Sequence, residues 1–271
     1  MKVGLIGCGA IGTTVALAIA EGRIPGVVLL AIADPVVTDA GKRAAAAAGC
    51  PLLAGDRDLL ELRPDLVVEA ASQEVVRRRA CEVLESGADL LIVSVGALAD
   101  TALLGQLLSA ARRRGRRIYV PSGAVGGMDI IKAAAAGGIE EVRLTTTKPA
   151  QSLAGAPWVR EHGIELGELR AATVIYEGPA CEAVLLFPQN VNVAAAIALA
   201  GIGLEKTTVR IVADPAAARN VHEIFVRGAF GEAAVRLENL PNPANPRSSY
   251  LAGLSVIATL RELGGTLRIG T

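Results

Sequence analysis

The stretch Lys2-Val3-Gly4-Leu5-Ile6-Gly7-Cys8-Gly9-Ala10-Ile11-Gly12 carries the pattern that decides the fold. An apolar run, which predicts a strand over 2–6, leads into glycines spaced G-x-G-x-x-G and then into a helical run over 10–21. In such a unit the first glycine permits a tight turn, the second lets the backbone approach a pyrophosphate, and the third allows the helix to pack closely on the strand. The N-terminus of the helix then offers free N–H donors to phosphate oxygens. We therefore expect a dinucleotide-binding turn, for which the contacting residues are Gly7, Gly9, Ala10, Ile11 and Gly12.

An acidic residue stands where this kind of turn requires one. Asp34 ends the predicted strand 27–33 and lies 22 residues past Gly12. A carboxylate there can accept both ribose hydroxyls of NAD and would repel the 2′-phosphate of NADP. The pattern favours a nucleotide-binding turn over a glycine turn that binds no ligand. It favours NAD as the cofactor, with NADP possible.

The first 120 residues continue as alternating strands and helices. Further strands are predicted over 66–70, 90–93 and 117–120, and helices over 39–48, 74–86 and 101–114. This alternation is typical of right-handed βαβ units and a parallel sheet. We predict an α/β fold with a Rossmann dinucleotide-binding domain over 1–120. Ser72 follows the strand 66–70, at the sheet edge where ligands bind, and is a candidate contact for the cofactor. An ordinary small turn residue is an equally good interpretation of this position.

The pattern changes after residue 120. Stretches with period-two alternation predict strands over 141–147, 171–176, 207–212, 220–227 and 233–238, with helices over 180–187 and 191–200. Residues 121–244 are therefore predicted to form a second α+β domain on a mostly antiparallel sheet. A last helix within 245–263, capped by Ser248 or Ser249, is expected to return to the first domain.

Charge balance and the pattern of uncharged runs argue against a nucleic-acid-binding protein and a membrane protein. The 27 basic and 27 acidic residues leave no net charge, which argues against a nucleic-acid partner. Two uncharged runs, 3–20 and 183–204, are long enough to suggest a membrane protein. The first is interrupted by glycines and the second by Pro188 and amide side chains, which are costly in lipid. We expect no membrane association.

The cysteines and histidines indicate neither a zinc site nor a disulfide framework. Four cysteines show no CxxC spacing, and there are only two histidines. We therefore predict that no metal is bound and that the protein is reduced and cytoplasmic.

Three residues of the second domain are candidates for chemistry. His222 shares a strand face with Ile224 and Val226, so it is either a core histidine or a proton donor or acceptor beside a nicotinamide. Lys148, at a strand end, is either exposed or holds a substrate carboxylate. Asn190 lies in an apolar stretch and either caps the next helix or binds a ligand.

Four segments together resemble the L-aspartate dehydrogenase family over essentially the whole chain. They are residues 7–12, 121–127, 187–194 and 220–223, and the stretch 245–249 with its helix also fits. The resemblance implies an NAD(P)-dependent enzyme that interconverts L-aspartate and iminosuccinate, or oxaloacetate plus ammonia, in NAD biosynthesis. It also implies a homodimer, with dimerisation and substrate binding assigned to 121–244. By motif match His222 takes the catalytic position, and Ala124 and Asn190 take NAD-contacting positions.

Two other functions remain open from the sequence. One is a homoserine-dehydrogenase-like or sugar-dehydrogenase-like oxidoreductase. Sugar dehydrogenases usually carry Glu-Lys-Pro after the strand that here ends at Ser94, where this chain has Val95-Gly96-Ala97. The other is a non-catalytic NAD(H)-sensing protein, for which 271 residues leave little room for an output module.

Overall fold

The computed structural model describes residues 1–188, 191–243 and 245–270. The chain forms two compact units. Unit 1 comprises Met1–Gly123 and Asn242–Ile269, and unit 2 comprises Ala124–Pro241 with Gly270. The units divide after Gly123 and after Pro241, and the predicted division into a dinucleotide-binding domain over 1–120 and a substrate and dimerisation domain over 121–244 stays a prediction.

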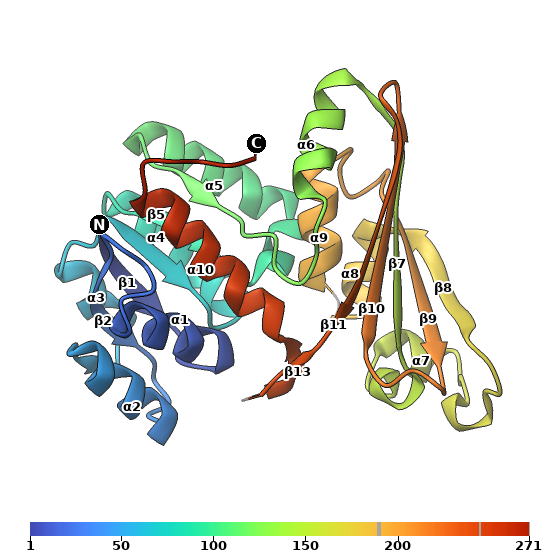
Figure 1. Ribbon diagram of the computed structural model, residues 1–271, viewed down its shortest axis with the longest axis horizontal. Coiled ribbons are helices and arrows are strands. Elements are labelled where there is room, and N and C mark those ends of the chain that lie inside the picture. The colour runs from blue at the N-terminus through green and yellow to red at the C-terminus, as the bar shows by residue number, and fades with distance from the viewer. Residues whose placement is uncertain (189–190, 244, 271) are drawn as a thin grey trace. The chain divides into compact units, whose positions relative to one another are not determined.

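Unit 1 is built on a parallel sheet of six strands in the order β3-β2-β1-β4-β5-β6 (Figure 1). The strands are β1 (Lys2–Ile6), β2 (Val28–Ala33), β3 (Leu52–Leu53), β4 (Leu66–Glu69), β5 (Asp89–Ile92) and β6 (Ile118–Tyr119). The order reverses between β1 and its neighbours β2 and β4, so a crevice forms beyond their carboxyl ends. This is the predicted Rossmann topology.

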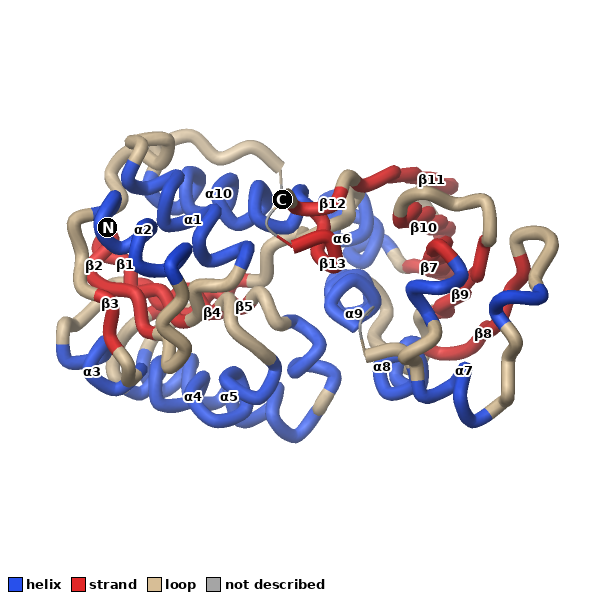
Figure 2. The backbone as a smooth tube through the Cα atoms, turned by 90° about the horizontal axis from the view of Figure 1, so that it is seen from below, coloured by secondary structure: helices blue, strands red, loops and turns tan. Residues whose placement is uncertain are grey.

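Helices cover both faces of this sheet. They are α1 (Ala10–Ala20), α2 (Asp39–Ala48), α3 (Asp56–Glu61), α4 (Gln73–Glu85), α5 (Thr101–Arg114) and α10 (Tyr250–Gly264). In Figure 2, α1, α2 and α10 lie on one side and α3, α4 and α5 on the other. Because both faces are covered, strand residues such as Leu5, Val68 and Leu91 are fully buried, which explains their unbroken apolar runs.

The C-terminal helix belongs to unit 1, as its apolar face predicts. Val256, Ile257 and Leu260 of α10 are buried in the same core cluster as Val3 and Val15. The helix starts at Tyr250 and ends at Gly264, one residue past the predicted range 245–263. Before it, Asn245–Ser249 forms strand β13, which was not predicted and which pairs with β12 (Pro241–Asn242). Ser249 caps α10 by accepting a hydrogen bond from the Leu251 N–H.

Unit 2 contains a five-stranded sheet in the order β11-β10-β7-β9-β8. Its strands are β7 (Ile139–Pro149), β8 (Thr173–Pro179), β9 (Thr208–Asp214), β10 (Asn220–Gly228) and β11 (Gly231–Asn239). Only the β7–β9 pair is parallel, so the prediction of a mostly antiparallel sheet is confirmed. The hairpin between β10 and β11 closes with Gly228 opposite Gly231.

One face of this sheet is packed against α6 (Met128–Gly137), α8 (Ala180–Leu186) and α9 (Val191–Ala200) (Figure 1). The short helix α7 (Pro157–Glu161) lies in the connection from β7 to β8. The inward residues alternate along the strands, for example Leu144 on β7 with Ile224 and Val226 on β10. This alternation is what the period-two pattern predicts.

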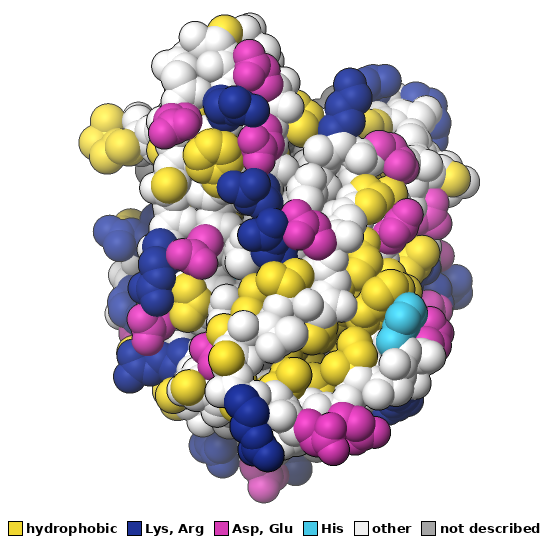
Figure 3. Space-filling view, turned by 90° about the vertical axis from the view of Figure 1, so that its right-hand side faces the viewer, with side chains coloured by type: hydrophobic (Ala, Val, Ile, Leu, Met, Phe, Trp, Pro, Cys, Tyr) yellow, Lys and Arg dark blue, Asp and Glu magenta, His cyan; other side chains and the backbone are white. Residues whose placement is uncertain are grey.

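The opposite face of the same sheet carries ion pairs. Arg143 pairs with Glu141 at 3.0 Å, and its guanidinium lies 5.2 Å from the ring centroid of Phe225. Arg210 pairs with Glu177 at 2.9 Å. Figure 3 shows basic and acidic side chains over much of the side that faces the viewer, with apolar side chains gathered in its lower half. None of the helices in the described ranges is long and apolar enough to cross a membrane.

Candidate active site

Unit 1 has a cleft of about 710 Å³ at the carboxyl ends of β1, β2 and β4. The glycine turn, Asp34 and Ser72 all line it, together with Thr38, Gly55 and Val75. Of the residues predicted to contact the cofactor, Gly7, Gly9, Asp34 and Ser72 line this cleft, whereas Ala10, Ile11 and Gly12 are not among its lining residues.

The three glycines of the turn have different structural roles. Gly7 has φ +94°, and a Cβ there would overlap the backbone of Ala70. A Cβ on Gly12 would overlap the Gly7 carbonyl, so close packing of α1 on β1 requires glycine. A Cβ on Gly9 would instead meet no atom and would project from the cleft wall. Gly9 is also the N-cap of α1 and offers no side chain to the free N–H groups of its first turn. The turn thus fits a pyrophosphate, since Gly9 leaves room for it and α1 supplies the donors.

Asp34 is held by the same turn. Its Oδ2 accepts a hydrogen bond from the Cys8 N–H at 2.7 Å, and its Oδ1 accepts one from the Val36 N–H at 2.8 Å. Each carboxylate oxygen can accept a second bond, so both remain able to receive ribose hydroxyls. Ser72 caps α4 by accepting from the Val75 N–H at 3.3 Å, and it is exposed in the cleft.

Residues without a predicted role also shape the cleft. Arg78 and Arg79 of α4 line it, and Arg79 pairs with Asp56 at 2.7 Å.

Glu69, at the end of β4, is buried and accepts hydrogen bonds from the Ala71 N–H, the Ser94 N–H and the Ser94 hydroxyl at 2.9–3.0 Å. Burial raises the pKa of Glu69. Glu69 thereby ties the loop after β4 to the loop after β5, a contact that sequence spacing does not reveal.

Unit 2 brings together Thr146 and Lys148 of β7 with His222 of β10. All three point to the helix-covered face and are 1%, 7% and 5% exposed, respectively. Thr146 is the cross-strand partner of His222, and its Oγ1 lies 3.0 Å from the imidazole Nδ1. Lys148 is therefore not the exposed strand-end lysine that its sequence position also allowed. Thr146 was missed because the register between the two strands is not visible in the sequence.

The surroundings change the acid–base behaviour of both titratable groups. Burial lowers the pKa of Lys148 from 10.5 to about 8. Burial and, secondarily, the charge of Lys148 lower the pKa of His222 from 6.5 to about 4. At neutral pH the group therefore consists of an uncharged imidazole near a cationic amine, an arrangement that suits an anionic ligand.

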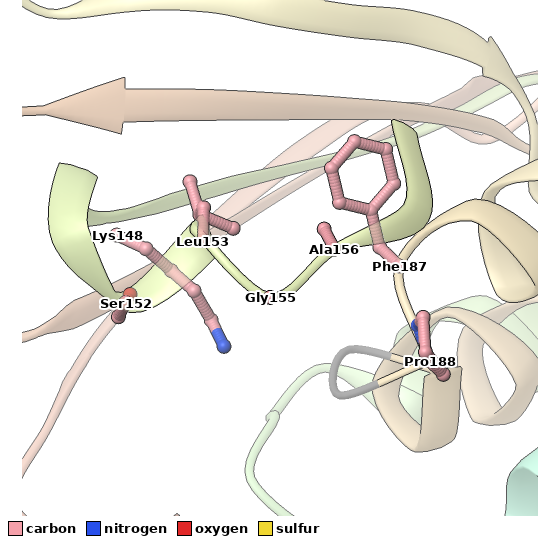
Figure 4. A pocket seen from close by; sticks show the side chains of 7 residues that line it. All are labelled: Lys148, Ser152, Leu153, Gly155, Ala156, Phe187 and Pro188. Atoms are coloured by element: carbon pink, nitrogen blue, oxygen red, sulfur yellow. The ribbon is translucent and has the colours of Figure 1, made fainter. Parts of the chain in front are cut away.

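Lys148 also lines a small pocket of about 40 Å³ with Ser152, Leu153, Gly155, Ala156, Phe187 and Pro188. Figure 4 shows the lysine side chain crossing the pocket with its amine toward the open space. The other lining side chains are largely apolar, so the amine is the dominant charge there.

The structure places Ala124 and His162 in unit 2 and does not describe Asn190. Ala124 begins unit 2, and its carbonyl accepts a hydrogen bond from Asn239 Nδ2 at 2.9 Å. Asn190 lies outside the described residues. His162 ends α7, is exposed, and stacks on Trp158. Within the described ranges, no group of three or more His, Cys, Asp or Glu residues could hold a metal ion.

Unit 1 is a Rossmann unit with a glycine turn and a carboxylate at the end of β2, and unit 2 carries a buried histidine and lysine. Together they define the chain as a dehydrogenase of the two-domain NAD(P)-dependent class. Residues 7–121 match the family model described as homoserine dehydrogenase, NAD binding domain, and residues 129–263 match the one described as aspartate dehydrogenase, C-terminal. The chain belongs to the L-aspartate dehydrogenase family.

Full-length similarity supports this assignment. L-aspartate dehydrogenase of Methanosarcina acetivorans is 47% identical over 271 residues, covering 100% of both chains. That of Nitrosopumilus maritimus is 41% identical, covering 100% of this chain and 99% of the relative. The crystal structure of aspartate dehydrogenase from Thermotoga maritima superposes with a TM-score of 0.79 at 30% identity, covering 100% of this chain and 99% of that one.

Proposed function

We propose that the chain catalyses the NAD(P)-dependent interconversion of L-aspartate and iminosuccinate, which water converts to oxaloacetate and ammonia. In the oxidative direction the Cα hydride and one amine proton leave aspartate, and a C=N bond forms. The observation that carries the proposal is the buried pair of His222 and Lys148, found in the unit that matches the aspartate dehydrogenase family model.

The cofactor would be held by unit 1. The backbone of Gly7, Gly9, Ala10, Ile11 and Gly12 would bind the pyrophosphate, and Asp34 the adenosine ribose. The nicotinamide half would lie near Ser72, and the resemblance adds Ala124 and Asn190 to its contacts. When bound, the nicotinamide ring supplies the hydride chemistry, which the protein directs by position.

Lys148 would hold a carboxylate of the substrate. A carboxylate taken out of water needs a charged or hydrogen-bonding partner, and the pocket around Lys148 offers its buried amine for this. The bound anion would in turn favour the protonated amine and raise its pKa.

His222 would act at the reacting nitrogen or oxygen, as a general acid or base or as a polarising donor. Its low pKa keeps the imidazole uncharged at neutral pH. An uncharged imidazole can donate through one nitrogen and accept through the other.

Replacement of His222 tests this assignment. We expect His222→Ala to lower turnover of oxaloacetate plus ammonium about 100-fold or more, the usual contribution of a positioned acid–base group. NADH binding, followed by fluorescence, should persist because the cofactor cleft lies in unit 1. His162→Ala, at an exposed site, is the matched control and should leave turnover unchanged. Unchanged turnover in His222→Ala would remove the residue from the mechanism.

The alternatives predict different substrates. NADH absorbance can be followed with oxaloacetate plus ammonium, then with homoserine and with sugars. A change only with homoserine would favour the homoserine-dehydrogenase-like reaction, and no change with any substrate would favour an NAD(H) sensor. The match of residues 129–263 to the aspartate dehydrogenase model supports the first reaction. The homodimer and the cytoplasmic location stay predictions from the sequence.

A further inference from the structure

We propose that Thr146 is a positioning residue that donates its hydroxyl proton to His222 Nδ1 and so fixes the tautomer in which Nε2 carries the proton. His222 would then face the substrate as a hydrogen-bond donor and not as a base. The inference rests on the proposed function, since it specifies how His222 takes part in that reaction.

The contact is built into the sheet. Thr146 and His222 are direct cross-strand partners on β7 and β10, and their side chains share the helix-covered face. The Oγ1–Nδ1 distance of 3.0 Å is that of a normal hydrogen bond. Both side chains are almost fully buried, at 1% and 5% exposure, so water does not readily replace this bond.

The direction of the bond follows from counting donors and acceptors. A threonine hydroxyl has one proton to donate. Among the described residues, the only hydrogen-bond partner of the Thr146 hydroxyl is His222 Nδ1. If Nδ1 carried the proton, the hydroxyl would accept and its own proton would remain buried without an acceptor, at a cost that such a site avoids. Donation from Thr146 satisfies both atoms.

The tautomer decides what the other ring nitrogen can do. With Nδ1 accepting, an uncharged imidazole must carry its proton on Nε2. The described residues provide no hydrogen-bond partner for Nε2. Burial of the ring and, secondarily, the positive charge of Lys148, two residues beyond Thr146 on β7, disfavour a second proton on the imidazole. An Nε2–H donor can polarise a carbonyl or an imine, or hold a carboxylate oxygen, without the ring becoming charged.

Nitrogen NMR of the full-length protein labelled with ¹⁵N-histidine tests the tautomer directly. The chain contains only His162 and His222, so His162→Ala assigns the spectrum. His162 is an internal reference, because its Nδ1 lies 3.0 Å from the Trp158 carbonyl, which can only accept. At pH 8 we expect a proton-bearing Nε2 for His222 and a proton-bearing Nδ1 for His162. A proton-bearing Nδ1 on His222 would overturn the proposal.

Two variants connect the tautomer to catalysis. Thr146→Val keeps the shape of the side chain but removes the donor, whereas Thr146→Ser keeps the donor. We expect Thr146→Val to shift the Nδ1 resonance of His222, because this nitrogen loses its hydrogen bond, and to lower kcat about tenfold, the loss of one oriented hydrogen bond. The NADH dissociation constant should stay unchanged, and Thr146→Ser should behave like the native protein. Thr147→Val, on the opposite face of β7, controls for effects on the strand.

The outcomes separate this inference from the proposed function. An unchanged NMR signature and rate in Thr146→Val would overturn the role of Thr146 while leaving the activity in place. Absence of aspartate formation by the native protein would overturn the proposed function, and the NMR result, which needs no substrate, would still report the tautomer.

Discussion

Lys148 and His222 are both titratable, and both lie almost entirely out of solvent. Burial lowers the pKa of each, because an uncharged form is favoured where water is excluded. The lysine remains mainly protonated at neutral pH and the histidine does not. The same physical effect therefore leaves two adjacent groups with different tasks, one charged and one a neutral hydrogen-bonding group.

Replacing Lys148 should weaken substrate binding and leave cofactor binding intact. We expect Lys148→Met, which keeps the length of the side chain, to raise KM for oxaloacetate at least about tenfold, because a charge-assisted hydrogen bond of about 1.5–3 kcal/mol is lost. Lys132→Met is the matched control, since Lys132 is exposed on α6 and makes a loose pair with Asp129 at 3.6 Å. Equal KM values in the two variants would exclude Lys148 from the substrate site.

The lowered pKa of Lys148 predicts a pH dependence of anion binding. The amine is charged below its pKa of about 8 and loses its proton as pH rises through that value. Inhibition by succinate, an unreactive dicarboxylate, should therefore weaken progressively above about pH 8, approaching tenfold per pH unit. Lys148→Met should show weak inhibition without this step. A native profile that is flat from pH 7 to 10 would contradict the assignment.

At the scale of elements, two glycines of the turn before α1 have different roles, one in ligand binding and one in the packing of the helix. A Cβ on Gly9 meets no protein atom, whereas one on Gly12 overlaps the Gly7 carbonyl. We expect Gly9→Ala to keep the native melting temperature and to weaken NADH binding about tenfold or more, because the methyl group occupies space needed by the pyrophosphate. Gly12→Ala should instead lower the melting temperature. NADH titration and thermal unfolding of both variants distinguish the two roles, and tight NADH binding by Gly9→Ala would refute the placement of the pyrophosphate.

Elements with strong local signals could be predicted from the sequence. The bounds of α2 and α5 agree with those predicted because Thr38 and Asp100 cap their starts, and Gly49 and Gly115 end them in the left-handed conformation. The five-residue helix α7 was missed because one turn of helix shows no periodicity. Strand parity placed His222 with Ile224 and Val226. The contact between His222 and Thr146, by contrast, depends on strand register, and the burial of Lys148 depends on which face the helices cover. Long-range packing determines both.

At the scale of the whole molecule, unit 1 is assembled from the two ends of the chain. Helix α10 contributes Val256 and Leu260, both fully buried, to the core that supports β1 and α1. The architecture of the cofactor cleft therefore depends on residues far from it in sequence.

Truncation of one α10 side chain should destabilise the protein. We expect Leu260→Ala to lower the free energy of unfolding by about 2–5 kcal/mol, since it leaves a cavity in a closely packed core. Leu267→Ala, at a position that is 74% exposed, should change it by less than about 0.5 kcal/mol. Urea denaturation measures both, and equal midpoints would show that α10 does not support this core.

Product analysis tests the proposed activity most directly. The native protein is incubated with NADH, oxaloacetate and ¹⁵N-ammonium, and the products are identified by NMR. We expect ¹⁵N-labelled L-aspartate in equal amount to the NADH oxidised, and almost none with His222→Ala. Formation of malate in place of aspartate, or no oxidation of NADH, would contradict it.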